Sequence, residues 1–238
     1  MKRALLLFAL LLVCGLPAKA AISFVRVAHA QSIAASSTLA ITMTVTAGDC
    51  IVVAVDYDNG STPPTSITDD GASGGNTYTL RTHATQNHDE SIWSTAANGT
   101  VSATIITITF PTSTAIARIA VAVDYSGVQS IGGTHTATSA GSATLSDSLT
   151  TLDANNFVVT GFMQTGSDTF TASAGNLRDQ LNGGAGFACV ALNDNTAALA
   201  SSVTNTVTST TTGQWAAATL ELRSTGGAAA PRKPPVVI

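Results

Sequence analysis

Charge, aromatic rings and lysine are all scarce in this chain. Only 10% of its 238 residues are charged and 5% are aromatic, whereas 45% are hydrophobic. Setting aside Lys2, Arg3 and Lys19 leaves 7 of the 10 basic residues against all 14 acidic ones, a net charge of −7 beyond residue 20. Proteins that bind phosphate backbones neutralise them with Lys and Arg. The composition therefore argues against nucleic acid as a partner.

Long apolar runs are also missing, apart from one at the start. Residues 4–13 are uninterruptedly apolar after Lys2 and Arg3, and Ala18 and Ala20 provide the small residues of a cleavage site. About ten residues are too few to span a bilayer of about 30 Å as a helix. The pattern predicts a signal peptide over residues 1–20, a mature chain that is secreted or at the cell surface, and no transmembrane span. A lipoprotein signal acylated at Cys14 is the alternative, which Val13 disfavours because a small residue normally precedes that cysteine.

Cysteine is rare once the signal is removed. The pair that remains, Cys50 and Cys189, is a disulfide candidate in an exported protein. It would close a loop of about 140 residues and stabilise the fold by about 4–5 kcal/mol in the chain-entropy model. The alternative is two buried free thiols that pack as small apolar residues.

Strand patterns dominate the rest of the chain. Residues 38–46 and 116–125 alternate between apolar and polar, residues 51–57 are almost continuously apolar, and no stretch shows the period of an amphipathic helix. Within residues 101–110 the apolar positions change phase, which predicts a β-bulge near Ile105 and Ile106. We expect an all-β protein: one antiparallel, two-sheet β-sandwich domain over residues 21–225, followed by a flexible tail over 226–238.

The second half of the chain echoes the first. Residues 51–55 (IVVAV) resemble 157–161 (FVVTG), Leu80-Arg81 recurs as Leu177-Arg178, and 123–126 (VDYS) resemble 220–223 (LELR). The matches keep their order along the chain. They favour the hypothesis of an internal duplication.

Three segments resemble a widespread group of bacterial secreted β-sandwich domains. They are residues 48–54 (GDCIVVA), 75–79 (GNTYT) and 122–128 (AVDYSGV). The resemblance spans roughly residues 22–224 and implies a jelly-roll-like fold in an extracellular setting. Such domains often belong to larger surface proteins, and the resemblance carries over no active residues. Cys50 departs from the group, which more usually has leucine at that position.

Four aspartates around one long loop form a weak calcium candidate: Asp56, Asp58, Asp69 and Asp70. An EF-hand loop starting at Asp56 fails, because its fifth position is Gly60 and its twelfth is Ile67. The alternative is that these side chains bond to the backbone of local turns. Apart from this candidate, no cofactor is expected.

The densest group of titratable residues is His83, His88, Asp89 and Glu90. A zinc site would need these ligands to converge, but residues five apart on a strand face opposite sides. We therefore expect a solvated hairpin tip, and we expect His29 and His135 to be isolated and exposed. Since the chain also has no nucleophile elbow and no distinguishable carboxylate pair, we do not expect an enzyme.

Trp93, Tyr57 and Tyr78 are candidates for stacking on sugar rings, with burial in the core as the alternative. Trp215 is expected in the core. Two functions follow: a non-catalytic secreted or cell-surface structural or adhesive β-sandwich module, and alternatively an extracellular carbohydrate-binding module. The partner would be an extracellular glycan or a cell-surface or matrix protein. Exposure of Trp93 separates the two hypotheses.

Overall fold

The structure is a computed structural model that describes residues 21–224, except 59–61, 98–99, 114–115, 167, 183–187, 197–198 and the side chains of 188 and 189. The predicted signal, with Cys14, and the predicted tail lie outside the described residues. The described chain is almost entirely strand, so the all-β prediction is confirmed. Among the described residues, no helix is long and apolar enough to cross a bilayer.

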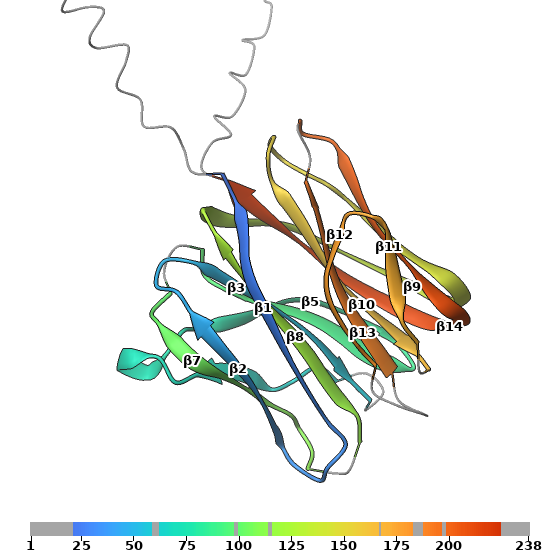
Figure 1. The fold of residues 1–238 in the computed structure, drawn as a ribbon, viewed down its shortest axis with the longest axis horizontal. Coiled ribbons are helices and arrows are strands. Elements are labelled where there is room, and N and C mark those ends of the chain that lie inside the picture. The colour runs from blue at the N-terminus through green and yellow to red at the C-terminus, as the bar shows by residue number, and fades with distance from the viewer. Residues whose placement is uncertain are drawn as a thin grey trace, which may run out of the picture.

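Strands β1–β8 and one short 3-10 turn make up the first half of the fold: β1 (Ser23–Ser32), β2 (Thr38–Val45), β3 (Cys50–Tyr57), β4 (Ser66–Asp69), η1 (Ala72–Gly74), β5 (Tyr78–Gln86), β6 (His88–Thr95), β7 (Ala103–Thr109) and β8 (Arg118–Ser126). Strands β9–β14 make up the second half: β9 (Val128–Thr150), β10 (Phe157–Thr165), β11 (Phe170–Ala174), β12 (Asn176–Asn182), β13 (Ala188–Thr196) and β14 (Ser202–Ser224). The halves lie side by side in Figure 1 and are called here the first lobe and the second lobe.

The first lobe is a sandwich of two antiparallel sheets. One sheet has the order β1-β8-β3-β6-β5 and the other has the order β2-β7-β4. Alternation in β2 sends Leu39, Ile41 and Met43 inward against the larger sheet and leaves the threonines between them exposed. The opposite face of the larger sheet is buried as well, because the second lobe covers it. This double burial explains why β3 and β8 are nearly continuous apolar runs.

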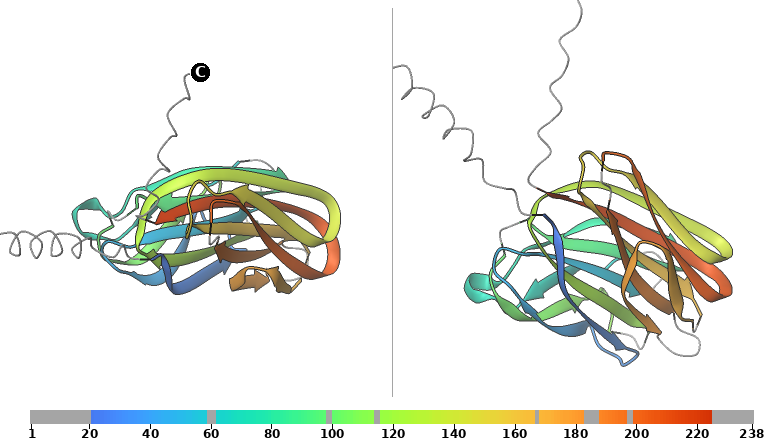
Figure 2. Two further views of the ribbon diagram at one scale, coloured as in Figure 1. Left: turned by 90° about the horizontal axis from the view of Figure 1, so that it is seen from above. Right: turned by 45° about the horizontal axis from the view of Figure 1, so that its top comes forward.

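The second lobe builds the same two layers from longer strands. Residues 128–139 of β9 pair with 215–224 of β14, while 144–150 of β9 pair with 202–208 of β14. Figure 2 shows these two paired strands curving back together. One layer therefore has the order β9-β14-β10-β13-β12, and the other has the order β9-β14-β11. The predicted sandwich thus contains three sheets rather than two, with β9 and β14 shared between the layers of the second lobe.

The two lobes agree in strand order and in register. Arg81 interrupts the β5–β6 ladder at the place where Arg178 interrupts the β12–β13 ladder. The ladder between β1 and β8 has a register shift next to Tyr125, and the ladder between β9 and β14 has one next to Leu222. Counting along the ladders from these points pairs Cys50 of β3 with Phe157 of β10. The lobes share one topology, and their origin by sequence duplication stays a hypothesis.

The lobes pack through their larger sheets in a contact that we call the seam. Its core is apolar and includes Val52, Val121, Val159 and Leu192. The contacts match in pairs: β8 packs on β13 as β14 packs on β6, and β1 packs on β12 as β9 packs on β5. Such matching is the pattern of an isologous interface between two like subunits.

The predicted β-bulge falls close to its expected place, but on the partner strand. The β2–β7 register shifts between Thr42 and Val45, opposite the segment between Ile105 and Ala103. Ile106 is buried, whereas Ile105 remains 40% exposed. The extra residue therefore lies in β2, whereas the alternation of burial breaks in β7, where Thr104 and Ile105 are both exposed.

The predicted disulfide is not formed. Cys50 lies opposite Tyr125, whose hydroxyl donates to Asp194 of β13, and Cys189 lies five residues back along β13. Five strand residues span about 17 Å, whereas bonded cysteines have Cα atoms about 4.4–6.8 Å apart. Cys50 is a buried free cysteine with its Sγ 4.0 Å from the carbonyl oxygen of Thr95. Burial raises the pKa of the Cys50 thiol to about 12.

Candidate functional site

A group of ionisable side chains lies in the seam at one end of β3 and β6. It consists of Asp56, Asp58, His88 and Glu90, which we call the acid cluster. Asp56 and Glu90 are directly opposite each other in the β3–β6 ladder. They share a face with Val52 and Ile92, which belong to the seam core, because side chains two residues apart on a strand point the same way. Both carboxylates therefore point toward the second lobe.

The histidine lies between two aspartates. His88 Nδ1 is 3.5 Å from Asp56 Oδ1, and His88 Nε2 is 3.4 Å from Asp58 Oδ1. The side chain of His88 is 7% exposed and that of Asp56 is fully buried, while Asp58 is 36% exposed. The cluster therefore reaches solvent on the Asp58 side only.

Glu90 is the most isolated member. It is fully buried, and neither of its carboxylate oxygens has a hydrogen-bond partner among the residues that the structure describes. It lies against Gly161 of β10, where an added Cβ would be 2.2 Å from Glu90 Oε1 and 2.8 Å from the Cβ of Ala54. Glycine is required there because the second lobe approaches the carboxylate with its bare backbone.

Burial perturbs the whole cluster. It raises the pKa of Asp56 to about 6, although the contact with His88 acts in the opposite direction. Burial also raises the pKa of Glu90 well above its ordinary value, and the charges of Asp56 and Asp89 add to the effect. Burial alone would lower the pKa of His88, but its contact with Asp56 and the charges of Asp56 and Asp58 raise it overall. Each of these three groups therefore releases its proton at a higher pH than the free side chain would.

A second acid–histidine pair lies on the other face of β6. His83 Nδ1 is 2.8 Å from Asp89 Oδ2, and the hydroxyl of Thr85 donates to the same oxygen. Burial raises the pKa of Asp89, against the lowering effect of its bond to His83. The prediction of a solvated hairpin tip is therefore wrong for His88, Asp89 and Glu90, which are all buried. His83, at 41% exposure of its side chain, is the member that remains open to solvent.

The four calcium candidates do not converge. Asp56 and Asp58 contact His88, whereas Asp69 accepts bonds from the Asn76 amide and the Tyr78 hydroxyl. Asp70 is held apart by Thr104, whose backbone and hydroxyl both donate to it. No three His, Cys, Asp or Glu side chains of the described residues are grouped so that they could hold a metal ion. Asp69 fits the alternative of local bonding, because it accepts from the backbone N–H groups of Gly71 and Asn76. Asp70 does not, because it bonds to Thr104 and Ile105 of β7.

The aromatic candidates for sugar binding are in the core. Tyr57 is fully buried, Trp93 is 6% exposed and Tyr78 is 7% exposed. Trp93 packs between the two sheets of the first lobe and donates its indole N–H to Ser91. None of the three offers a ring face to a ligand. The burial of Trp93 therefore weighs against a function in which these rings stack on sugars. Trp215 is also in the core, as expected.

The two histidines expected to be isolated each have an acidic partner. His29 Nδ1 is 2.6 Å from Asp179 Oδ2, across the seam from β1 to β12. His135 Nδ1 is 2.5 Å from Asp147 Oδ1, and the Thr219 hydroxyl donates to the other oxygen of that carboxylate. The Thr219 hydroxyl is therefore linked to a carboxylate and a histidine, but Thr219 is fully buried, so a substrate could not reach that hydroxyl. Both histidines remain partly exposed.

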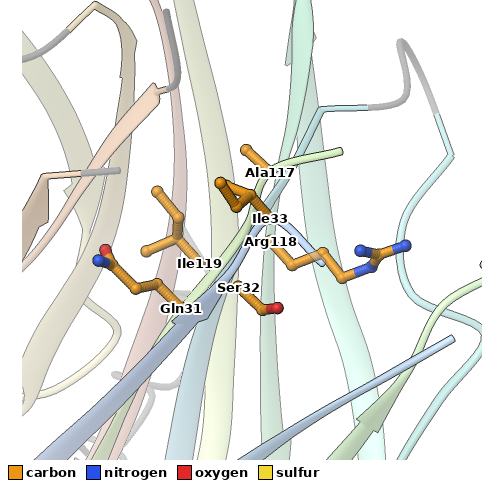
Figure 3. Close-up of a pocket in the computed structure, with 6 residues that line it drawn as sticks. All are labelled: Gln31, Ser32, Ile33, Ala117, Arg118 and Ile119. Carbon is orange, nitrogen blue, oxygen red and sulfur yellow. The ribbon is translucent and has the colours of Figure 1, made fainter. Parts of the chain in front are cut away.

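A cavity of about 190 Å³ lies at the start of β8, the strand that pairs with β3 next to Asp56. Gln31, Ser32 and Ile33 line it from the end of β1, and Ala117, Arg118 and Ile119 line it from the start of β8. Figure 3 shows Arg118 extending away from Gln31 and Ile119. Its guanidinium donates to the carbonyls of Ala34, Ile116 and Thr112. The cavity therefore offers an amide and a hydroxyl but no reactive group.

Comparison of the chain with protein-family models, with curated proteins and with solved structures finds no match. The acid cluster holds protons in a dry contact between two sheets and presents no nucleophile to a substrate. Strand periodicity alone could have placed Asp56 and Glu90 on the faces of Val52 and Ile92, but no sequence signal shows that a second sheet covers those faces.

Proposed function

We propose that the protein is a non-catalytic structural or adhesive module that works at the cell surface or in the extracellular matrix. The proposal rests mainly on the outer face of the second lobe, where hydroxyl groups pair across neighbouring strands. The pairs, which we call the hydroxyl ladder, are Ser146–Thr206 at 2.9 Å, Ser148–Thr204 at 2.8 Å and Ser173–Thr208 at 2.8 Å.

Paired hydroxyls suit contact with a flat polar partner. Thr is stiff at χ1, and a cross-strand bond fixes the hydroxyl further, so little side-chain freedom is lost on binding. Each hydroxyl keeps donor or acceptor capacity for a partner or a bridging water. The face therefore suits the hydroxyls of an extracellular glycan or the polar surface of a matrix or cell-surface protein.

The interior supports a non-catalytic role. The acid cluster is closed over by the second lobe, and the aromatic candidates are buried. The predicted signal peptide supports the extracellular setting. The carbohydrate-binding alternative, which depended on Trp93, Tyr57 and Tyr78, loses its ring platform, although a glycan remains a possible partner for the hydroxyl ladder.

Retention on insoluble cell-envelope or matrix material tests the proposal. We expect the wild type to be retained, and Thr206→Asp to weaken retention about tenfold because it places a carboxylate among paired hydroxyls. Thr42→Asp, on the outer face of the first lobe, is the matched control and should bind as the wild type does.

Freely diffusing protein that never sediments with the envelope or matrix would contradict the proposal. Equal retention of Thr206→Asp and the wild type would exclude the hydroxyl ladder as the binding face.

A further inference from the structure

The two ends of the seam differ in how their charges are paired. At one end, Asp194 of the second lobe accepts a bond of 2.7 Å from the Tyr125 hydroxyl of the first lobe and one of 2.7 Å from Arg178 Nε. The Arg178 guanidinium also lies over the Phe24 ring of the first lobe, 4.3 Å from its centroid. This end is held by a complete network that crosses between the lobes.

The other end holds the acid cluster and has no such network. Toward Asp56 and Glu90 the second lobe presents Gly161, Met163 and Ala216, none of which carries a charge or a side-chain hydrogen bond donor. Met163 packs on Ala84, the residue opposite Glu90 in the β5–β6 ladder.

Within the described part of the chain, the charged groups around the two carboxyls come from the first lobe. On the same face they are Asp58 and His88, and Asp89 with His83 lies on the opposite face of β6. The flanking strands add Ala84 from β5 and Ile119 from β8, which are both apolar. Among the described residues of β10, β13 and β14, no charged side chain faces this end. His88 can therefore neutralise only one of several carboxylates.

Ionisation of both Asp56 and Glu90 would leave unpaired charge in a dry contact. Such charge is strongly unfavourable unless water or a counter-ion reaches it. Water has no room beside Glu90 while Gly161 lies against it, because even an added Cβ on Gly161 would be only 2.2 Å from Glu90 Oε1. The carboxylates can be hydrated only if the second lobe moves away from this end.

We propose that the acid cluster makes the seam a pH-controlled joint: with Asp56 and Glu90 protonated the lobes are closed, and ionisation of these carboxyls opens the seam at the Gly161–Met163 end. The Tyr125–Asp194–Arg178 network keeps the opposite end closed and acts as the hinge. The raised pKa values of Asp56 and Glu90 agree with this direction.

Two buried methionines give a direct readout with an internal control. Met163 is fully buried in the seam beside Ala84, and Met43 is 4% exposed in the separate core of the first lobe. Peroxide converts exposed methionine to the sulfoxide, and mass spectrometry of separate peptides measures both residues in one sample. We expect the ratio of the Met163 rate to the Met43 rate to rise at least about tenfold between about pH 5 and about pH 8.

Neutral variants connect that rise to the cluster. Asp56→Asn combined with Glu90→Gln should reduce the change in the ratio to about twofold or less, because no charge then develops in the seam. Asp70→Asn is the matched control, since Asp70 is exposed and its hydrogen bonds to Thr104 lower its pKa to about 2. It should leave the wild-type rise intact. Gly161→Ala should raise Met163 oxidation already at about pH 5, because the added Cβ wedges the seam open.

The proposal is overturned by any of three results. The Met163 rate could stay flat in the wild type, Met43 could rise in step with it, which would mean global unfolding, or the double neutral variant could keep the full pH dependence.

Discussion

The same ladder position carries opposite chemistry in the two lobes. In the first lobe Asp56 is opposite Glu90, and at the matching position of the second lobe Met163 is opposite Val190. The next strand outward carries Ala84 in the first case and Leu181 in the second. Since the second lobe forms the same sheet with apolar residues, the fold does not require the carboxylates. We expect unpaired buried carboxylates to reduce stability at neutral pH, so their presence points to a reason other than folding.

At a second pair of matching positions the second lobe carries a carboxylate and the first lobe a neutral hydroxyl. Arg81 donates from Nε to the Ser94 hydroxyl at 2.8 Å, and at the matching bulge Arg178 donates from Nε to Asp194 at 2.7 Å. The bulge aims both arginines in the same direction, but only the second lobe places a carboxylate there. The buried carboxylate of Asp194 in the second lobe is therefore paired with an arginine, whereas that of Asp56 in the first lobe contacts a histidine.

The largest effect should follow from giving the second lobe the residue of the first. Val190 is fully buried, so Val190→Glu places a carboxyl in the seam core without a cation. A buried Glu with its pKa raised by about 3–4 units destabilises a protein by about 4–6 kcal/mol when ionised. Urea unfolding at about pH 8 should show this loss, and at about pH 4 it should be much smaller. Equal losses at both pH values would mean that ionisation of a carboxyl at position 190 does not destabilise the seam, in contrast to what we expect for Glu90.

The two arginines should differ in importance. Arg178→Ala leaves the buried Asp194 without its cation and should destabilise the protein by about 3–5 kcal/mol. Arg81→Ala removes a bond to a neutral hydroxyl and should destabilise it by about 1 kcal/mol. Chemical denaturation of the two variants measures the difference. Similar values would show that Asp194 does not depend on Arg178.

A smaller effect should follow at the contact between the lobes. In Gly161→Ala the added methyl meets Glu90 and Ala54, and we expect a destabilisation of about 1–3 kcal/mol. Gly141→Ala is the matched control, because an added Cβ there meets no atom within 4 Å. Thermal unfolding should leave the control near the wild-type midpoint. A neutral Gly161→Ala would mean that the seam is looser than its geometry shows.

Strand patterns and local matches were predictable from the sequence. The alternation of residues 38–46 predicted β2 and its buried face. The matches of Leu80-Arg81 with Leu177-Arg178, and of residues 123–126 with 220–223, agree with the ladder registers. The match of residues 51–55 with 157–161 was one residue out of register. An apolar run has no distinctive residue that would fix its alignment.

The acid cluster was not predictable in the same way. The run His88-Asp89-Glu90 has the composition of an exposed turn, and only the pairing of β6 with β3 inside a covered sheet makes it interior. That covering comes from β10 and β14, more than sixty residues away in the sequence. Trp93 and Tyr57 lie on the opposite face, which the β2-β7-β4 sheet covers, and no sequence signal shows that covering either. Local periodicity assigns a side chain to a face but does not say which faces are doubly buried.

The pH dependence of stability tests the central claim most directly. Burial raises the pKa of Asp56 from 3.8 to about 6, so the unfolded chain releases this proton first as the pH rises. The contribution of Asp56 to stability is then greatest below about pH 4 and falls by about 3 kcal/mol as the pH rises through its folded-state pKa. Glu90 and His88, whose pKa values are also raised, act in the same direction.

The measurement is the free energy of unfolding from about pH 4 to about pH 8 for the wild type and for Asp56→Asn combined with Glu90→Gln. Asp124, whose pKa burial raises to about 7, titrates in both proteins and cancels in the difference. We expect the wild type to lose at least about 3 kcal/mol more than the double variant over this range. Parallel profiles for the two proteins would contradict it.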